Sequence, residues 1–212
     1  MIEKFIKAIE EADSAPKLVK AVRDLAEAKQ PEAIPVLIKV LGYNNPGAAV
    51  AAVDGLISLG NIAIPALLEQ LDGYNYGARA WAIRVLAGIG DPRGLNLLLD
   101  AAANDFALSV RRAAAKGLGN IQWNLLATAE INHAQSQTLA TLLKTSQDVE
   151  WVVRYAAVVG LQGLATELLD RQEQNAIDQI LKRLGEIIKE DDTLTVKARA
   201  LFAQQKLTVS GC

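Results

Sequence analysis

Cysteine and histidine are scarce in this 212-residue chain, and each shortage excludes a class of site. The single cysteine, Cys212, cannot build a disulfide framework or a thiolate metal cluster within the chain, and it favours a reducing, cytoplasmic setting. The single histidine, His133, cannot supply the several His–Glu pairs of a di-iron repeat hydroxylase, so we expect no metal site. A Cys–His nucleophile pair would have to use a terminal thiol, which is poorly placed for an oriented attack.

The chain also lacks net charge and long apolar runs at its N-terminus. The 22 basic and 24 acidic residues leave a net charge of -2, so no global field would draw the protein to nucleic acid or to an anionic membrane. The opening sequence MIEKFIKAIEEAD places charged residues among the apolar ones at helical spacing, unlike a signal peptide. We therefore expect no nucleic-acid binding, no membrane insertion and recognition of partners by local surfaces.

Self-similarity is what the chain has in abundance. GAAVAAVDGLISLGN from Gly47 matches GARAWAIRVLAGIGD from Gly77, a shift of 30 residues. VRRAAAKGLGNI from Val110 matches VRYAAVVGLQGL from Val153, and VKARALFA from Val196 follows at the same shift of 43 residues. Repetition with such periods is typical of a helical solenoid, in which each short unit buries its apolar face against its neighbours.

Each unit is predicted to contain two helices. AIPALLEQL places Pro65 in a first helical turn, and GARAWAIRVLAGIG places Ile83 and Leu86 on one apolar face before a terminating glycine. We predict an all-α fold, a HEAT-like solenoid that forms a right-handed superhelix of helix pairs, as a single domain over residues 1–212. The wider spacing of the later units predicts a longer connecting segment near 120–137, which contains His133.

An acidic residue precedes a basic residue by six positions in three successive units. The pairs are Asp105 and Arg111, Asp148 and Arg154, and Asp191 and Lys197. We interpret this spacing as a structural pairing that ties each interhelical turn to its own second helix. Gly73 replaces the acid before Arg79, so Arg79 is predicted to be the freest of the aligned cations to meet a ligand or a partner.

The block YNYGARAWAIRVLAGIGDPRGL, with VRRAAAKGLG and VRYAAVVGL, resembles the smaller subunit of the heterodimeric E/F-type phycobilin lyases. The resemblance spans most of the chain. It implies attachment of phycocyanobilin, through a thioether bond, to a cysteine of the phycocyanin α subunit, in a complex with a larger homologous lyase subunit. Phycocyanobilin would be a transferred ligand and not a tightly bound cofactor, and the attacking thiol would belong to the acceptor.

A bilin offers two propionates, polar pyrrole nitrogens and a long conjugated surface, which suit arginine and aromatic side chains. Several such residues stand near the starts of the second helices. The candidates for bilin or partner binding are Tyr74, Tyr76, Arg79, Trp81, Arg84, Trp123, Trp151 and Tyr155. For Trp81 and Trp123, packing between units is an equally weighted alternative.

His133 is the one candidate for a catalytic residue, and a surface role is at least as well supported. The smaller subunit of an isomerising relative carries the motif Asn-His-Cys-Gln-Gly-Asn, and Asn132, His133 and Gln135 match three of its positions. Ala134 replaces the cysteine, so we predict a plain lyase subunit and not an isomerising lyase that forms phycoviolobilin. Two alternatives stay open: a non-catalytic HEAT-like adaptor or chaperone in phycobilisome assembly, and a subunit whose larger partner holds most of the pigment.

Overall fold

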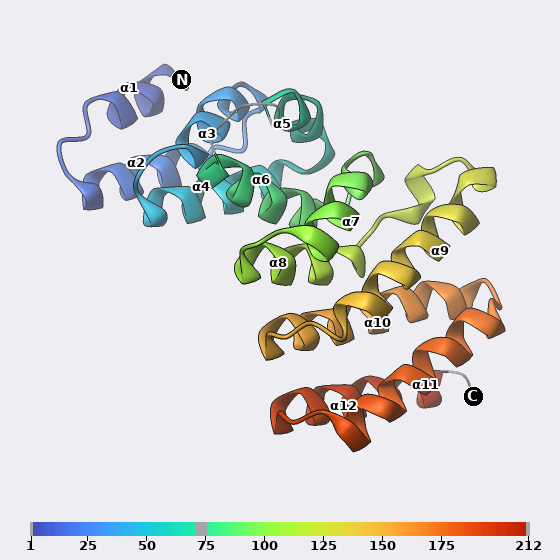
Figure 1. The fold of residues 1–212 in the computed structure, drawn as a ribbon. Coiled ribbons are helices and arrows are strands. Elements are labelled where there is room, and N and C mark those ends of the chain that lie inside the picture. Colours follow the sequence, from blue (N-terminus) through green and yellow to red (C-terminus); the bar gives the residue numbers. More distant parts are fainter. Residues whose placement is uncertain (1, 71–75, 211–212) are drawn as a thin grey trace. The chain divides into compact units, whose positions relative to one another are not determined.

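The computed structural model describes residues 2–70 and 76–210, which form helices joined by short turns (Figure 1). In these two ranges every regular element is an α-helix or a short 3-10 helix, which confirms the prediction of an all-α HEAT-like solenoid. The chain divides into two compact units, Met1–Gly94 and Leu95–Cys212. The fold therefore consists of stacked helix pairs within each unit.

The first unit contains six α-helices in its described residues. They are α1 (Glu3–Glu10), α2 (Ala15–Glu27), α3 (Ile34–Leu41), α4 (Pro46–Leu59), α5 (Ile64–Gln70) and α6 (Tyr76–Ile89). Prolines stand in the first turns of α2, α3 and α4, where the missing N–H costs no intrahelical hydrogen bond. Asn45 caps α4 by accepting a hydrogen bond from the Ala48 N–H at 3.0 Å. Helix α4 packs between α2 and α6, so the second helices form a continuous layer.

The second unit contains six further α-helices in the residues that the structure describes. They are α7 (Leu95–Asn104), α8 (Leu108–Leu118), α9 (Thr128–Thr145), α10 (Trp151–Asp170), α11 (Gln174–Glu190) and α12 (Leu194–Ser210). Helices α8, α10 and α12 pack side by side in one layer, and α7, α9 and α11 form the other (Figure 1). The candidates Trp151 and Tyr155 come from α10, in the first of these layers.

The longer connection predicted near 120–137 is mostly helical, which corrects that boundary. A short 3-10 helix, Trp123–Leu125, leads into α9, which begins at Thr128. The segment EINHAQSQ is mostly polar, but it follows a helical pattern: Ile131, Ala134 and Thr138 are buried at helical spacing. The wider repeat is therefore built by lengthening the helices.

Two apolar stretches, Pro46–Glu69 and Trp151–Asp170, have the length and composition of a membrane-crossing helix. About half of each apolar window is buried inside the protein, 44% and 50% respectively. The first stretch is also broken at Gly60, whose φ of 69° lies in the left-handed region and ends α4. Both stretches have the character of core helices of stacked repeats.

Glycine allows α8 and α10 to approach at backbone distance. A methyl group built on Gly160 would overlap the carbonyl oxygen of Ala115, and one built on Gly163 would overlap the carbonyl oxygen of Gly119. Contacts of this kind leave no room for a side chain at these two positions of α10. The small residues of the repeated sequence therefore fix the separation of the two helices.

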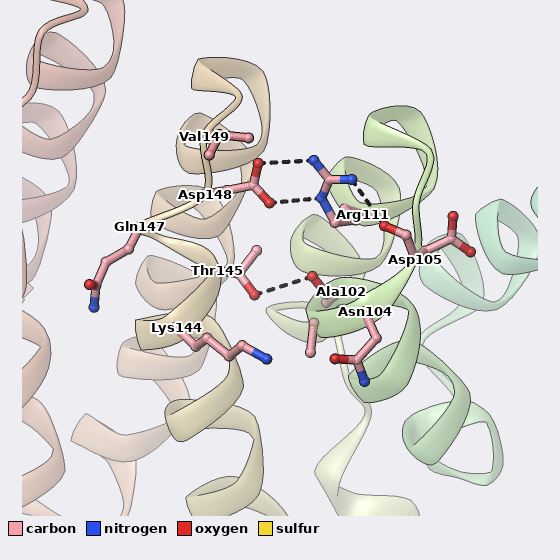
Figure 2. Close-up of a pocket in the computed structure, with 10 residues that line it drawn as sticks. Ala102, Asn104, Asp105, Arg111, Lys144, Thr145, Gln147, Asp148 and Val149 are labelled. Carbon is pink, nitrogen blue, oxygen red and sulfur yellow. Dashed lines mark hydrogen bonds and ion pairs between the residues drawn. The ribbon is translucent and has the colours of Figure 1, made fainter.

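Arg111 and Arg154 tie their own turns to their own helices, as predicted, but they do so through backbone carbonyls. The carboxylates that they bind belong to the next repeat. Arg111 Nε and Nη2 donate to the two carboxylate oxygens of Asp148, at 2.7 and 3.0 Å (Figure 2). Arg154 donates in the same way to Asp191, at 2.8 and 3.0 Å. Arg111 Nη1 also donates to the Asp105 backbone carbonyl oxygen, at 2.9 Å.

The aspartate carboxylates do not pair with the basic residue six positions later, because each already accepts a backbone N–H of its own turn. Asp148 Oδ1 accepts the Glu150 N–H and Asp191 Oδ1 accepts the Thr193 N–H, both at 2.9 Å. This turn geometry aims the carboxylate at the preceding repeat. Lys197 also departs from the expectation, since its Nζ donates to the Lys189 carbonyl oxygen at 3.0 Å. We call Arg111, Asp148, Arg154 and Asp191 the Asp–Arg ladder.

The ladder lowers the pKa of both aspartates. Burial alone would raise the pKa of Asp148 and Asp191, but the hydrogen bonds from the arginines and from the turn N–H groups outweigh it. A carboxyl whose pKa is lowered by folding stabilises the protein above its unfolded-state pKa of about 3.9. That stabilisation is lost as the pH falls through the folded-state pKa, so the ladder should weaken in acid.

We expect Gly163→Ala to lower the free energy of unfolding by about 1–3 kcal/mol, because overpacking against a backbone carbonyl forces the helices apart. Gly185→Ala on α11 is the matched control, since the nearest atom to its added methyl lies 4.0 Å away. That change should stabilise the protein by about 0.5–1 kcal/mol, because alanine loses less backbone entropy. Urea unfolding followed by circular dichroism measures both, and equal effects would contradict the close helix approach.

We expect Asp148→Asn to cost about 3 kcal/mol at pH 7, because the Arg111 side chain, 13% exposed, would lose its only described carboxylate acceptors. Between about pH 5 and pH 2 the variant should lose less stability than the wild type, since it lacks one titrating carboxylate. Asp13→Asn removes an exposed pair with Lys17 and should cost less than about 0.5 kcal/mol. Unfolding curves at several pH values provide the test, and a variant that parallels the wild type in acid would contradict it.

Candidate functional site

A groove of about 710 Å³ opens beside the Asp–Arg ladder at the turn edge of the second unit (Figure 2). Its walls come from the end of α7 and the start of α8 on one side, and from the end of α9 and the turn before α10 on the other. The lining includes Asn104, Asp105, Arg111, Lys144, Thr145, Gln147, Asp148 and Val149. Arg111 and Asp148 neutralise each other there, so the ladder groups in this groove hold the repeats together and are not available as an acid or a base.

Exposed apolar side chains follow the same edge. Leu108, Trp151 and Leu194 are the first residues of α8, α10 and α12, and they are 42%, 45% and 80% exposed. Phe106 and Val149 are exposed in the turns just before two of these helices. We call these five residues the apolar rim. Exposed apolar side chains that recur at the same place in successive repeats suit a site that binds a ligand or another protein.

In the first unit, the structure brings together two of the predicted residues. The Arg84 guanidinium lies 4.2 Å from the centroid of the Trp81 ring, a cation–π contact between two half-buried side chains of α6. Tyr76 is exposed at the start of the same helix. Arg79 takes part in an interaction within the protein, and its role toward a ligand or a partner stays a prediction. Tyr74 lies outside the described residues.

In the second unit, Trp151 and Tyr155 share one face of α10, because residues four apart on a helix are neighbours. Trp151 is exposed and Tyr155 is half-buried, so both can contact a ligand. Trp123 is only 5% exposed and belongs to the core, which supports its packing alternative. The predicted candidates of this unit therefore reduce to a surface on α10.

His133 lies on α9, in the layer opposite to α8, α10 and α12. Its side chain is exposed, and the neighbouring Asn132 accepts a hydrogen bond from Arg171 Nη2 at 3.1 Å. Ala134 and Gln135 are buried against the core. A cysteine at position 134 would therefore face the helix packing and not the surface that carries His133. The catalytic role of His133 stays a prediction.

Sequence reasoning missed Arg199 and Phe202, which α12 places beside Tyr155. Arg199 Cζ lies 6.0 Å from the centroid of the Tyr155 ring and 5.5 Å from that of Phe202. The available signal was the repeat itself, because a shift of 43 residues aligns α12 with α10 and places their outer faces side by side. These residues extend the α10 surface onto α12.

Comparison with known proteins identifies the family. Residues 64–162 match HEAT repeats, and residues 8–43 match the PBS lyase HEAT-like repeat. The phycocyanobilin lyase subunit beta of Nostoc sp. PCC 7120 is 52% identical over 97% of this chain and 100% of its own length. The phycocyanin alpha phycocyanobilin lyase CpcF of a Synechocystis species is 51% identical over 97% of this chain and 94% of its own.

A solved structure gives the same answer. The complex of CpcE and CpcF of phycocyanin lyase from Nostoc sp. PCC 7120 matches with a TM-score of 0.74 and 52% sequence identity, over 82% of this chain and 99% of the matched chain. Identity at this level over nearly the whole length goes well beyond the shared solenoid architecture. The chain belongs to the family of phycocyanobilin lyase beta subunits.

Proposed function

We propose that this chain is the smaller subunit of a heterodimeric lyase that attaches phycocyanobilin, through a thioether bond, to a cysteine of the phycocyanin α subunit. The observation that carries the proposal is the 52% identity over nearly the full length to a phycocyanobilin lyase subunit beta. The matching structure of a complex between CpcE and CpcF supports a larger partner subunit. Phycocyanobilin is then the transferred ligand, and the cytoplasm, where the phycobilisome is built, is the proposed place of action.

The reaction adds the acceptor's S–H group to the ethylidene carbon of the bilin. Sulfur forms a bond to carbon and a proton enters the tetrapyrrole, so no other atom is gained or lost. An enzyme accelerates such an addition by holding the two reactants in the reacting geometry. The described residues of this chain suit that task, since Trp151 and Tyr155 offer aromatic faces and the apolar rim offers a surface for the acceptor.

The isomerising alternative has weaker support. Moving a double bond along the tetrapyrrole requires proton removal and delivery by an acid and a base held together. Ala134 offers neither, and it is buried next to the exposed His133. We therefore propose attachment without isomerisation.

The first test is a reconstitution from purified parts. This chain, the larger subunit, the phycocyanin α apoprotein and phycocyanobilin are mixed, and pigment that stays on the acceptor after denaturation is measured by absorbance. We expect attachment only when both lyase chains are present. Unchanged attachment without this chain would make it an adaptor, and a product with a shorter conjugated system would restore the isomerising alternative.

Two substitutions separate the α10 surface from His133. Trp151→Ala should lower the rate of attachment by roughly 5- to 30-fold, because a central exposed aromatic often carries 1–2 kcal/mol of binding. His133→Gln should keep the rate within about twofold of the wild type, whereas a true acid–base catalyst would contribute about 10²–10⁴-fold. The same absorbance assay measures both, with heterodimer formation checked by gel filtration. If His133→Gln lowers the rate more than Trp151→Ala does, the active surface lies on α9 and not on α10.

A further inference from the structure

The α12 helix carries an arginine that the repeat architecture does not require. A shift of 43 residues aligns Arg199 with Ala156 of α10 and then with Ala113 of α8. Ala156 is buried in the layer of second helices, and Ala113 is half-buried. Arg199 therefore breaks the pattern of small residues, and packing alone does not explain a guanidinium there.

Aromatic rings surround this arginine. Its Cζ lies 6.0 Å from the centroid of Tyr155 on the adjacent α10 and 5.5 Å from the centroid of Phe202 on its own helix. Lys206 Nζ lies 5.6 Å from the centroid of the same Phe202 ring. Phe202 is exposed, and Trp151 is exposed one turn before Tyr155. We call Tyr155, Arg199, Phe202 and Lys206 the α10–α12 cluster.

The charge of Arg199 is not balanced as the charges of the ladder arginines are. Arg111 and Arg154 each donate two hydrogen bonds to one carboxylate. Arg199 Nη1, in contrast, is buried with no hydrogen-bond partner among the described residues. Burial lowers the pKa of Arg199, and the interaction with Tyr155 opposes this only in part, so the guanidinium is a charged group with an unfilled donor.

A buried donor without an acceptor is costly, and a carboxylate is the acceptor that best fits a guanidinium. The exposed Phe202 ring and the half-buried Tyr155 ring beside it supply a flat apolar surface, which suits a conjugated ligand more than a flexible acidic side chain. We propose that Arg199 binds a carboxylate of a flat, conjugated small molecule that lies against Tyr155 and Phe202. Resting on the function proposed above, this carboxylate is a propionate of phycocyanobilin.

The propionate contact can be tested without any substitution. Phycocyanobilin and its dimethyl ester differ in the charge of the propionates but share the conjugated system. Each is titrated into the purified heterodimer, and the dissociation constants are read from the change in absorbance. We expect the free acid to bind about 10- to 100-fold more tightly, as a charge-assisted hydrogen bond to a buried guanidinium implies. Equal binding of acid and ester would overturn the proposal.

Substitutions then assign the contact to Arg199. Arg199→Gln should weaken binding of the free acid by about tenfold or more and leave binding of the ester nearly unchanged. The preference for the acid is then lost. Arg199→Lys should keep part of the preference, because a lysine retains the charge but not the bidentate geometry. Arg171→Gln is the matched control, an exposed arginine at the far end of α10, and it should keep the full preference.

The outcomes separate this inference from the proposed function. If Arg199→Gln weakens binding of the acid and binding of the ester equally, Arg199 has a packing role and the proposal is wrong. The same holds if the variant keeps the preference for the acid. If the wild-type heterodimer binds the acid preferentially but attaches no pigment to the acceptor, the proposed lyase function fails while the carboxylate site stands. Should Arg199→Gln not assemble with the larger subunit, the acid and ester titrations of the wild type and of Arg199→Lys still decide.

Discussion

The hydrogen-bonded ion pair between an arginine of one repeat and an aspartate of the next is the interaction on which the second unit depends. Asp148 binds the guanidinium of Arg111 through both of its carboxylate oxygens and also accepts the N–H of its own turn. A buried ion pair is tolerated only when its hydrogen bonds are satisfied, and here they are. Each aspartate thus shapes one turn and fixes the position of the neighbouring repeat at the same time.

This fixed position determines which surfaces α8, α10 and α12 share. Because Gly160 and Gly163 bring α10 to backbone distance from α8, the first residues of the second helices lie along one edge. The apolar rim stands at that edge, and the α10–α12 cluster lies further along the same layer. The ladder arginines and aspartates neutralise one another. Arg199, whose Nη1 has no hydrogen-bond partner among the described residues, can bind an external ligand.

The sequence predicted the repeats well, because helical periodicity and spacing are local properties. It misassigned the carboxylate that each ladder arginine binds. Spacing along the chain identifies recurring residues but does not show which neighbour a long side chain reaches. It also treated residues 128–137 as a connection, because most of them are polar and only a few, such as Ile131 and Ala134, form the buried face. Trp123 and Trp151 looked alike as aromatic candidates, and only three-dimensional packing separates the buried one from the exposed one.

Arg199 was missed for a more general reason. Residues that maintain a solenoid must recur in each repeat, so a search for recurrence finds the ladder, the alanines and the glycines. A residue that binds a particular ligand need occur only once, so a search for recurring residues does not find it. In α12 an arginine stands where α8 and α10 have alanine, and it lies between rings with a donor unfilled. Positions that break the repeat without improving its packing are therefore where a ligand-specific function in such a solenoid should be sought.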